Sequence, residues 1–232
     1  MASAIARGTS GMAHAIERMK KFWEKELYRQ VCLFILSLMM KKPKARDRIL
    51  ETAAKLFHER GYSEVGINEI IDKADTAKAT FYQHFPSKQS LCAAWLEEMH
   101  RRSETRHRDI LDGPGTAIEK IDTYFANLGT FMEASDFRGC PYSNTGAVID
   151  EECACLMQKI EEHKIAIRNF FHRLTSQFAH SDRRSREVGD ALFLLYSGAA
   201  VEAQNLRSLW PVEAARRSAA ELCHLEEAPV PK

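Results

Sequence analysis

The sequence predicts an all-α protein in which a three-helix helix-turn-helix domain is followed by a helical bundle. Apolar residues recur at helical spacing along most of the 232 residues, and no stretch alternates as a strand does. The 7 prolines and 11 glycines supply few turn signals. A chain of this length buries a sizeable core. We divide it into an extension (1–40), two domains (41–90 and 91–226) and a tail (227–232).

The extension contains one continuous apolar run, VCLFILSLMM, at residues 31–40. It is shorter than the roughly 20 residues that a membrane-spanning helix needs, and it lacks the cleavage site of a signal peptide. Three interpretations stay open: a helix docked on the body, a membrane-surface or scaffolding segment, or translated sequence upstream of a true start at Met39 or Met40. We expect no stable membrane insertion.

Composition and motifs favour a cytoplasmic protein with no catalytic residue, metal or cofactor. The net charge is +1, so any attraction to nucleic acid must come from a local patch. The six cysteines have no framework spacing, which favours reduced thiols. There is no Gly-rich phosphate loop, nucleophile elbow or HExxH motif. Cys153, Cys155 and His163 lack a fourth ligand at zinc-site spacing.

Two helices and a short loop are expected at the start of the first domain. Apolar residues from Ile49 to Phe57 recur at helical spacing, and Gly61 is the expected stop. A second helix with an apolar stripe follows Gly66 and ends near Asp75.

Aromatic residues crowd a third and shorter helix, which Pro86 ends because it has no N–H and restricts the residue before it. Phe81 and Phe85, four residues apart, share one face and are expected in the core. Tyr82 and His84 fall off that face, where they can reach phosphates or base edges in a major groove. A fourth helix, capped by the serine that follows Pro86, completes the helix-turn-helix outline.

The stretch from Ala45 to Leu91 resembles the DNA-binding domain of the TetR family of bacterial one-component transcription regulators. The pattern A-x-x-L-F-x-x-x-G-Y runs from Ala53 to Tyr62, and T-x-Y-x-x-F-x-S-K runs from Thr80 to Lys88. Two positions depart from the family: Asp75 stands where a glycine usually makes the turn, and Gly66 where a serine or threonine usually caps the second helix. Both residues allow the required backbone geometry.

The resemblance implies a dimeric repressor that a small-molecule effector releases from a palindromic double-stranded operator. Thr76 to His84 would form the recognition helix and its approach, and a basic arm would lie near the DNA, made of Lys41, Lys42, Lys44 and Arg46. Lys78 and Thr80 are candidates for base or phosphate contact. The residues implied to contact DNA are Lys44, Thr76, Ala77, Lys78, Thr80, Tyr82, His84 and Lys88.

Helical periodicity continues through the second domain, where the family motifs fade. Helices are expected over residues 118–134, 151–178, 186–209 and 212–226, with breaks at DGPG, DFRGCPYSN, AHSD and Pro211. In the family the last two long helices pair with a second subunit. Small residues suited to that close approach are Gly198, Ala199, Ala200 and Ala203. The alternative is that these residues belong to the core of one chain.

An effector pocket is expected among the aromatic residues of the second domain, because ligand pockets are largely apolar with a few polar groups. The candidates are Tyr124, Phe125, Phe131, Cys140, Tyr142, Phe170, Phe193 and Tyr196. Core packing is the alternative for each. Some family members carry a similar Gly-Cys turn whose thiol senses oxidants or electrophiles. This makes a thiol-based regulator a second hypothesis, with Arg138 as the cation that activates Cys140, although most such cysteines act as small hydrophobes.

Overall fold

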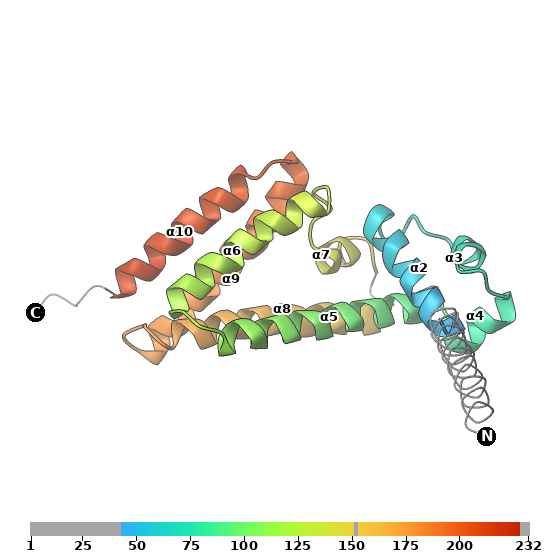
Figure 1. The fold of residues 1–232 in the computed structure, drawn as a ribbon, viewed down its shortest axis with the longest axis horizontal. Helices are drawn as coiled ribbons and strands as arrows, with labels where there is room; N and C mark the ends of the chain where they lie inside the picture. The colour runs from blue at the N-terminus through green and yellow to red at the C-terminus, as the bar shows by residue number, and fades with distance from the viewer. Residues whose placement is uncertain (1–42, 151–152, 228–232) are drawn as a thin grey trace, which may run out of the picture. The chain divides into compact units, whose positions relative to one another are not determined.

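The computed structural model describes residues 43–150 and 153–227, and these residues are folded as helices joined by short loops (Figure 1). Within them there are nine α-helices and no β-strand, which confirms the all-α prediction. The described residues from Ala45 onward form one compact unit. The interpretations of residues 31–40 and of Lys41 and Lys42 lie outside the described residues. None of the described helices is long and apolar enough to cross a bilayer.

The first four described helices follow the predicted boundaries closely. They are α2 (Ala45–Arg60), α3 (Ile67–Lys73), α4 (Lys78–His84) and α5 (Lys88–Asp112). Gly61 ends α2 with φ +90°, a conformation that costs glycine little. Ser87 caps α5 by accepting from the backbone N–H of Ser90 at 3.0 Å, and the Ser90 hydroxyl accepts in return from the Ser87 N–H. The domain boundary predicted at residue 90 lies inside α5. The division into domains stays a prediction.

The second half differs from the sequence prediction at several helix boundaries. Its helices are α6 (Ala117–Ala134), α7 (Pro141–Gly146), α8 (Ala154–Thr175), α9 (Asp182–Leu206) and α10 (Trp210–Glu227). Pro211 is the second residue of α10 and does not interrupt this helix, because a proline in the first turn of a helix costs no hydrogen bond. For the same reason α7 begins at Pro141, inside a predicted break. α9 begins four residues earlier than expected because Ser181 accepts from the N–H of Arg184 and caps it.

Helices α2 to α5 share one buried core with parts of the chain that follow them. Phe81 and Phe85 are buried in this core, as predicted, together with residues of α2, α3 and α5. Tyr142 of α7 and Leu156 of α8 belong to the same cluster. Because packed interiors transmit displacement, a shift of α7 would also displace side chains of this core.

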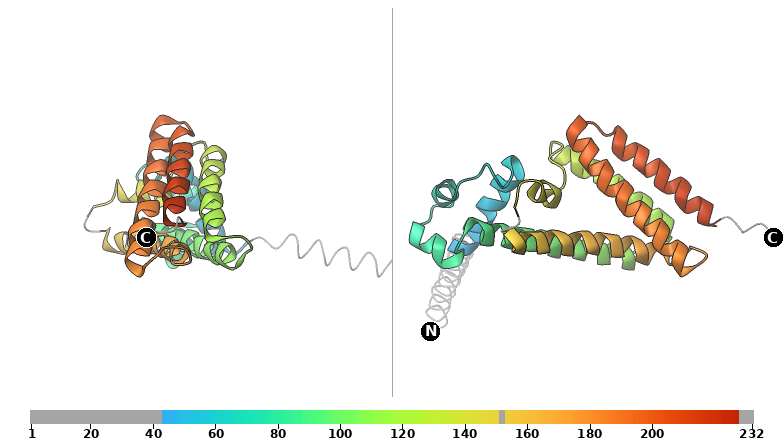
Figure 2. Two further views of the ribbon diagram at one scale, coloured as in Figure 1. Left: turned by 90° about the vertical axis from the view of Figure 1, so that its left-hand side faces the viewer. Right: turned by 180° about the vertical axis from the view of Figure 1, so that it is seen from behind.

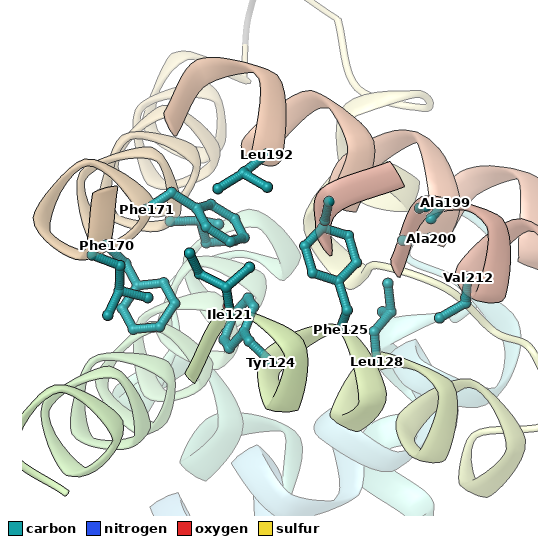
Figure 3. Packing of buried hydrophobic residues seen from close by; sticks show 14 of the residues in the cluster. Ile121, Tyr124, Phe125, Leu128, Phe170, Phe171, Leu192, Ala199, Ala200 and Val212 are labelled. Atoms are coloured by element: carbon teal, nitrogen blue, oxygen red, sulfur yellow. The ribbon is translucent and has the colours of Figure 1, made fainter. Parts of the chain in front are cut away.

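A second core lies among α6, α8, α9 and α10 (Figure 3). Figure 2 shows α6, α9 and α10 lying beside one another, and α5 beside α8. Ala199, Ala200 and Ala203 are buried within this core, so the alternative that they pack inside one chain is confirmed for these three. Gly198 is different: it is exposed, and a Cβ placed on it would meet no atom within 4 Å.

Candidate nucleic-acid interface and effector cavity

Helix α4 presents polar side chains to solvent because its two phenylalanines hold the opposite face in the core. Phe81 and Phe85 are 0% and 3% exposed, and their ring centroids are 6.3 Å apart. Tyr82, 41% exposed, meets the edge of the Phe81 ring at 5.3 Å. The other predicted contacts also reach the surface: Ala77, Lys78 and His84 are exposed, and Thr76 and Thr80 are half-buried. The structure therefore brings these predicted residues together on one short helix and its approach.

The turn between α3 and α4 is held by an arginine that the sequence did not single out. Asp75 adopts φ +48°, the left-handed conformation that favours glycine. Arg48 of α2 donates from Nε to the carbonyl of Ala74 at 3.1 Å and from Nη2 to the carbonyl of Asp75 at 3.0 Å. Two charge-assisted hydrogen bonds at the end of α3 offset the cost of a non-glycine residue there.

Lys88 fixes the loop that precedes α3. Its Nζ donates to the carbonyl of Ser63 at 3.2 Å and lies 4.5 Å from the centre of the Tyr62 ring. Burial lowers the pKa of Lys88 and raises that of Tyr62 to about 12. The lysine predicted to meet phosphate thus also stabilises the domain itself.

The two described members of the basic arm differ in their surroundings. Lys44 is exposed. Arg46 places its guanidinium 5.4 Å from the centre of the Phe85 ring, a cation–π distance. Arg46 therefore covers one side of the core that orients α4.

A cavity of about 110 Å³ lies among α5, α6, α7, α8 and α9. Five of the eight predicted ligand residues line it: Tyr124, Phe131, Cys140, Tyr142 and Tyr196. Phe125, Phe170 and Phe193 do not. Phe125 follows Tyr124 by one residue, a turn of about 100° on a helix, and lies in the second core (Figure 3). Phe170 stacks on His107 at 4.4 Å, and Phe193 packs against the second core.

The sequence prediction missed the face of α5 that lines this cavity, and the polar residues of the lining. Met99, Ser103 and Arg106 line it from α5, and their spacing of four and three residues places them on one helical face. That spacing could have indicated a helix face that lines a cavity. In a charged segment, however, such a face is hard to distinguish from one exposed to solvent. Asn127 and His163 complete the polar lining.

Tyr142 lines the cavity and also belongs to the core of α2 to α5. Its hydroxyl donates to the carbonyl of Leu96 in α5 at 2.7 Å, and its ring stacks on His163 with centroids 3.6 Å apart. Burial, with smaller contributions from nearby positive charges, lowers the pKa of His163 to about 3, so this imidazole is neutral at neutral pH. The tyrosine is 2% exposed.

The turn between α6 and α7 makes a second contact, with α2. Arg138 donates from Nε to the carbonyl of His58, near the end of α2, at 3.0 Å. Gly139 follows with φ +71°, and a Cβ there would lie 1.9 Å from Oε1 of Gln204. The turn between α6 and α7 is therefore tightly packed between α2 and α9.

The cation beside Cys140 is Lys164, which corrects the expectation that Arg138 activates this thiol. Nζ of Lys164 lies 3.8 Å from the Cys140 sulfur and donates to the Ser143 hydroxyl at 3.0 Å. Arg138 points instead to the backbone of α2. Cys140 is half-buried.

The histidine, cysteine and acidic residues in the described part of the chain do not form a metal-binding site. No group of three histidine, cysteine or acidic side chains is arranged there to hold a metal ion. His107 instead has Nε2 2.8 Å from the Tyr124 hydroxyl, and burial lowers its pKa to about 4. His163 stacks on Tyr142, as described above.

Comparison with known proteins agrees with the geometry of α2 to α5. A profile of the family described as "Bacterial regulatory proteins, tetR family" matches residues 49–95. The chain belongs to the TetR family. Within this family it is similar to the HTH-type transcriptional repressor NemR of Escherichia coli K12, with 26% identity over 182 residues, 72% of this chain and 88% of NemR. It is also 24% identical to the HTH-type transcriptional regulator LmrA of Bacillus subtilis over 156 residues, 66% of this chain and 83% of LmrA.

Solved structures extend the similarity in fold to the second half of the chain. The TetR-family regulator SCO4454 of Streptomyces coelicolor superposes with a TM-score of 0.73 at 22% identity, covering 81% of this chain and 98% of that one. The reduced form of E. coli NemR superposes with a TM-score of 0.66 at 21% identity, covering 77% and 97%. The fold of this chain is therefore that of TetR regulators in both the DNA-binding helices and the bundle.

Proposed function

We propose that the protein is a cytoplasmic transcriptional repressor that binds operator DNA as a homodimer and is released by a small molecule held in the cavity. The observation that carries this proposal is α4, a seven-residue helix fixed by buried Phe81 and Phe85 with Lys78, Tyr82 and His84 on its outer face. A short helix presented in this way matches the second helix of a helix-turn-helix, which enters the major groove.

The roles of the exposed residues follow from their chemistry. Lys78, at the N-terminal end of α4, is suited to a phosphate or a base edge, and Tyr82 and His84 to the phosphate backbone. Phosphate contacts position the helix without reading sequence. Lys88 is already engaged by Ser63 and Tyr62, so we assign it to orienting the domain, with any phosphate contact secondary.

The dimer surface that we propose is the exposed apolar stripe of α9 with the end of α10. Leu194 (66% exposed), Gly198 and Val201 (38% exposed) are spaced by four and three residues on α9, so they share one face. Leu225 of α10 is 71% exposed. A two-fold interface uses the same patch on both chains, and the missing side chain of Gly198 allows the helices to approach closely.

The signal is proposed to pass through the turn between α6 and α7. A ligand in the cavity would touch Cys140 of this turn and Tyr142 at the start of α7. The turn is hydrogen-bonded to α2 through Arg138, and the start of α7 to α5 through Tyr142. A ligand that fits best when the turn has shifted favours a dimer whose two recognition helices no longer match successive major grooves. A tenfold release of DNA requires about 1.4 kcal/mol of differential binding.

A thiol-based response is the second candidate function, and the position of Cys140 is the observation that favours it. The sulfur lines the cavity with the Lys164 ammonium 3.8 Å away, which is the kind of electropositive, partly exposed environment in which reactive cysteines occur. An electrophilic ligand would then be captured covalently at the place where a reversible ligand is proposed to act.

Lys78→Ala is expected to weaken binding to an operator fragment selected from random DNA, because it removes a charge from the proposed interface. The slope of log affinity against log salt concentration should fall by about 1. Fluorescence anisotropy across a salt series measures both. Lys55→Ala is the matched control, since Lys55 is an exposed lysine on α2. Equal losses in the two variants would contradict the docking through α4.

Leu194→Glu is expected to weaken the dimer about a hundredfold, because two-fold symmetry places the new charge in the interface twice. Sedimentation equilibrium measures the monomer–dimer constant. Met157→Glu, at a residue of α8 that is 49% exposed, is the control and should leave the constant unchanged. A Leu194→Glu protein that dimerises like the wild type would exclude the α9 stripe.

Cys140→Ser separates the two candidate functions. In a thiol-based regulator, N-ethylmaleimide releases the wild-type protein from the operator fragment, and Cys140→Ser keeps its affinity but no longer responds. Cys155→Ser, at an exposed cysteine, should respond like the wild type. An unchanged response in Cys140→Ser would remove this thiol from the mechanism and leave the reversible ligand. Electrophoretic mobility shifts with and without the reagent give the result.

A further inference from the structure

One arginine of α5 lines the cavity and has no partner among the residues that the structure describes. Arg101 and Arg102 both form ion pairs with Glu98, and Arg108 donates to the Thr105 hydroxyl. In the described residues Arg106 takes part in no hydrogen bond or ion pair, and its side chain is exposed at the cavity. An arginine left unpaired at the edge of an apolar cavity is available to a ligand.

The charge of the cavity is positive. Among the described residues that line it, Arg106 is the charged side chain, and no aspartate or glutamate is present. His163 is neutral at neutral pH, because burial and nearby positive charges, Arg106 among them, lower its pKa to about 3. The Lys164 ammonium beside Cys140 has the same sign. A cationic ligand would therefore be repelled, and an anionic one attracted.

The size and the walls of the cavity favour one aromatic ring. A void of about 150 Å³ encloses benzene. This cavity measures about 110 Å³ and opens to solvent, so it takes at most one ring, with the rest of the ligand in the opening. Five rings contribute to its walls: those of Tyr124, Phe131, Tyr142 and Tyr196 and the imidazole of His163. Aromatic walls stack on a flat ring at little entropic cost.

We infer that the cavity binds a single-ring aromatic carboxylate, with the ring among the tyrosines and the carboxylate on the Arg106 guanidinium at the mouth. The guanidinium fork matches a carboxylate with two parallel hydrogen bonds, and the Asn127 amide, which lines the same cavity, is a further donor. This inference rests on the proposed function, since it names the chemical class of the effector for the same cavity.

Three isosteric probes test the charge preference directly: benzoate, benzamide and benzamidine carry negative, zero and positive charge on nearly the same shape. Isothermal titration of the full chain should show benzoate binding about tenfold more tightly than benzamide, about 1.4 kcal/mol, and benzamidine more weakly than both. In Arg106→Gln the preference for benzoate over benzamide should disappear. Arg108→Gln, on the same helix, should keep it.

Three results would overturn the inference: no binding of benzoate to the wild type, equal binding of benzoate and benzamide, or a benzoate preference that survives in Arg106→Gln with its helical circular dichroism intact. Operator binding measured with and without benzoate separates this inference from the proposed function. If benzoate binds with the expected preference but leaves operator affinity unchanged, the carboxylate site stands and the effector role fails. If the preference is absent while Lys78→Ala still weakens operator binding, the carboxylate site alone fails.

Discussion

The hydroxyl of Tyr142 must find a partner because the side chain is buried, and the partner it finds is the carbonyl of Leu96. This bond ties α7 to α5, while the Tyr142 ring belongs to the core of the DNA-binding helices and also lines the cavity. The neighbouring Arg138 holds the same turn to α2 through the His58 carbonyl. One short segment thus contacts both the place where a ligand is proposed to bind and the helices that are proposed to bind DNA.

The helix-turn-helix was predictable because its determinants are local. Gly61, Pro86 and Ser87 set helix ends through backbone chemistry, and the spacing of Phe81 and Phe85 sets which face of α4 is buried. The clamp that Arg48 places on the turn was not predictable, since it joins residues 26 and 27 positions apart. The helix starts at Pro141 and Pro211 were wrongly predicted as breaks, because a proline can either end a helix or occupy the first turn of the next one.

The residues of the candidate cavity were predicted only in part, because its lining depends on contacts between distant parts of the chain. Aromatic composition indicates that rings gather in the bundle, but which ring faces the cavity depends on rotations of about 100° between neighbours, as Tyr124 and Phe125 show. The partner of Cys140 comes from Lys164, 24 residues along the chain, so the nearer Arg138 was the wrong choice. Contacts between helices are set by tertiary packing, and a single sequence does not record them.

Hydrogen exchange of the amides in α2 to α4 tests most directly whether the cavity wall and the DNA-binding core are coupled through Tyr142. Tyr142→Phe keeps the ring and removes the bond to Leu96. We predict that exchange in α2–α4 becomes about fivefold faster relative to α9–α10, which corresponds to the loss of about 1 kcal/mol from one buried hydrogen bond. Tyr196→Phe, at the same cavity but outside that core, should leave α2–α4 unchanged. Unchanged exchange of α2–α4 in Tyr142→Phe would contradict the coupling.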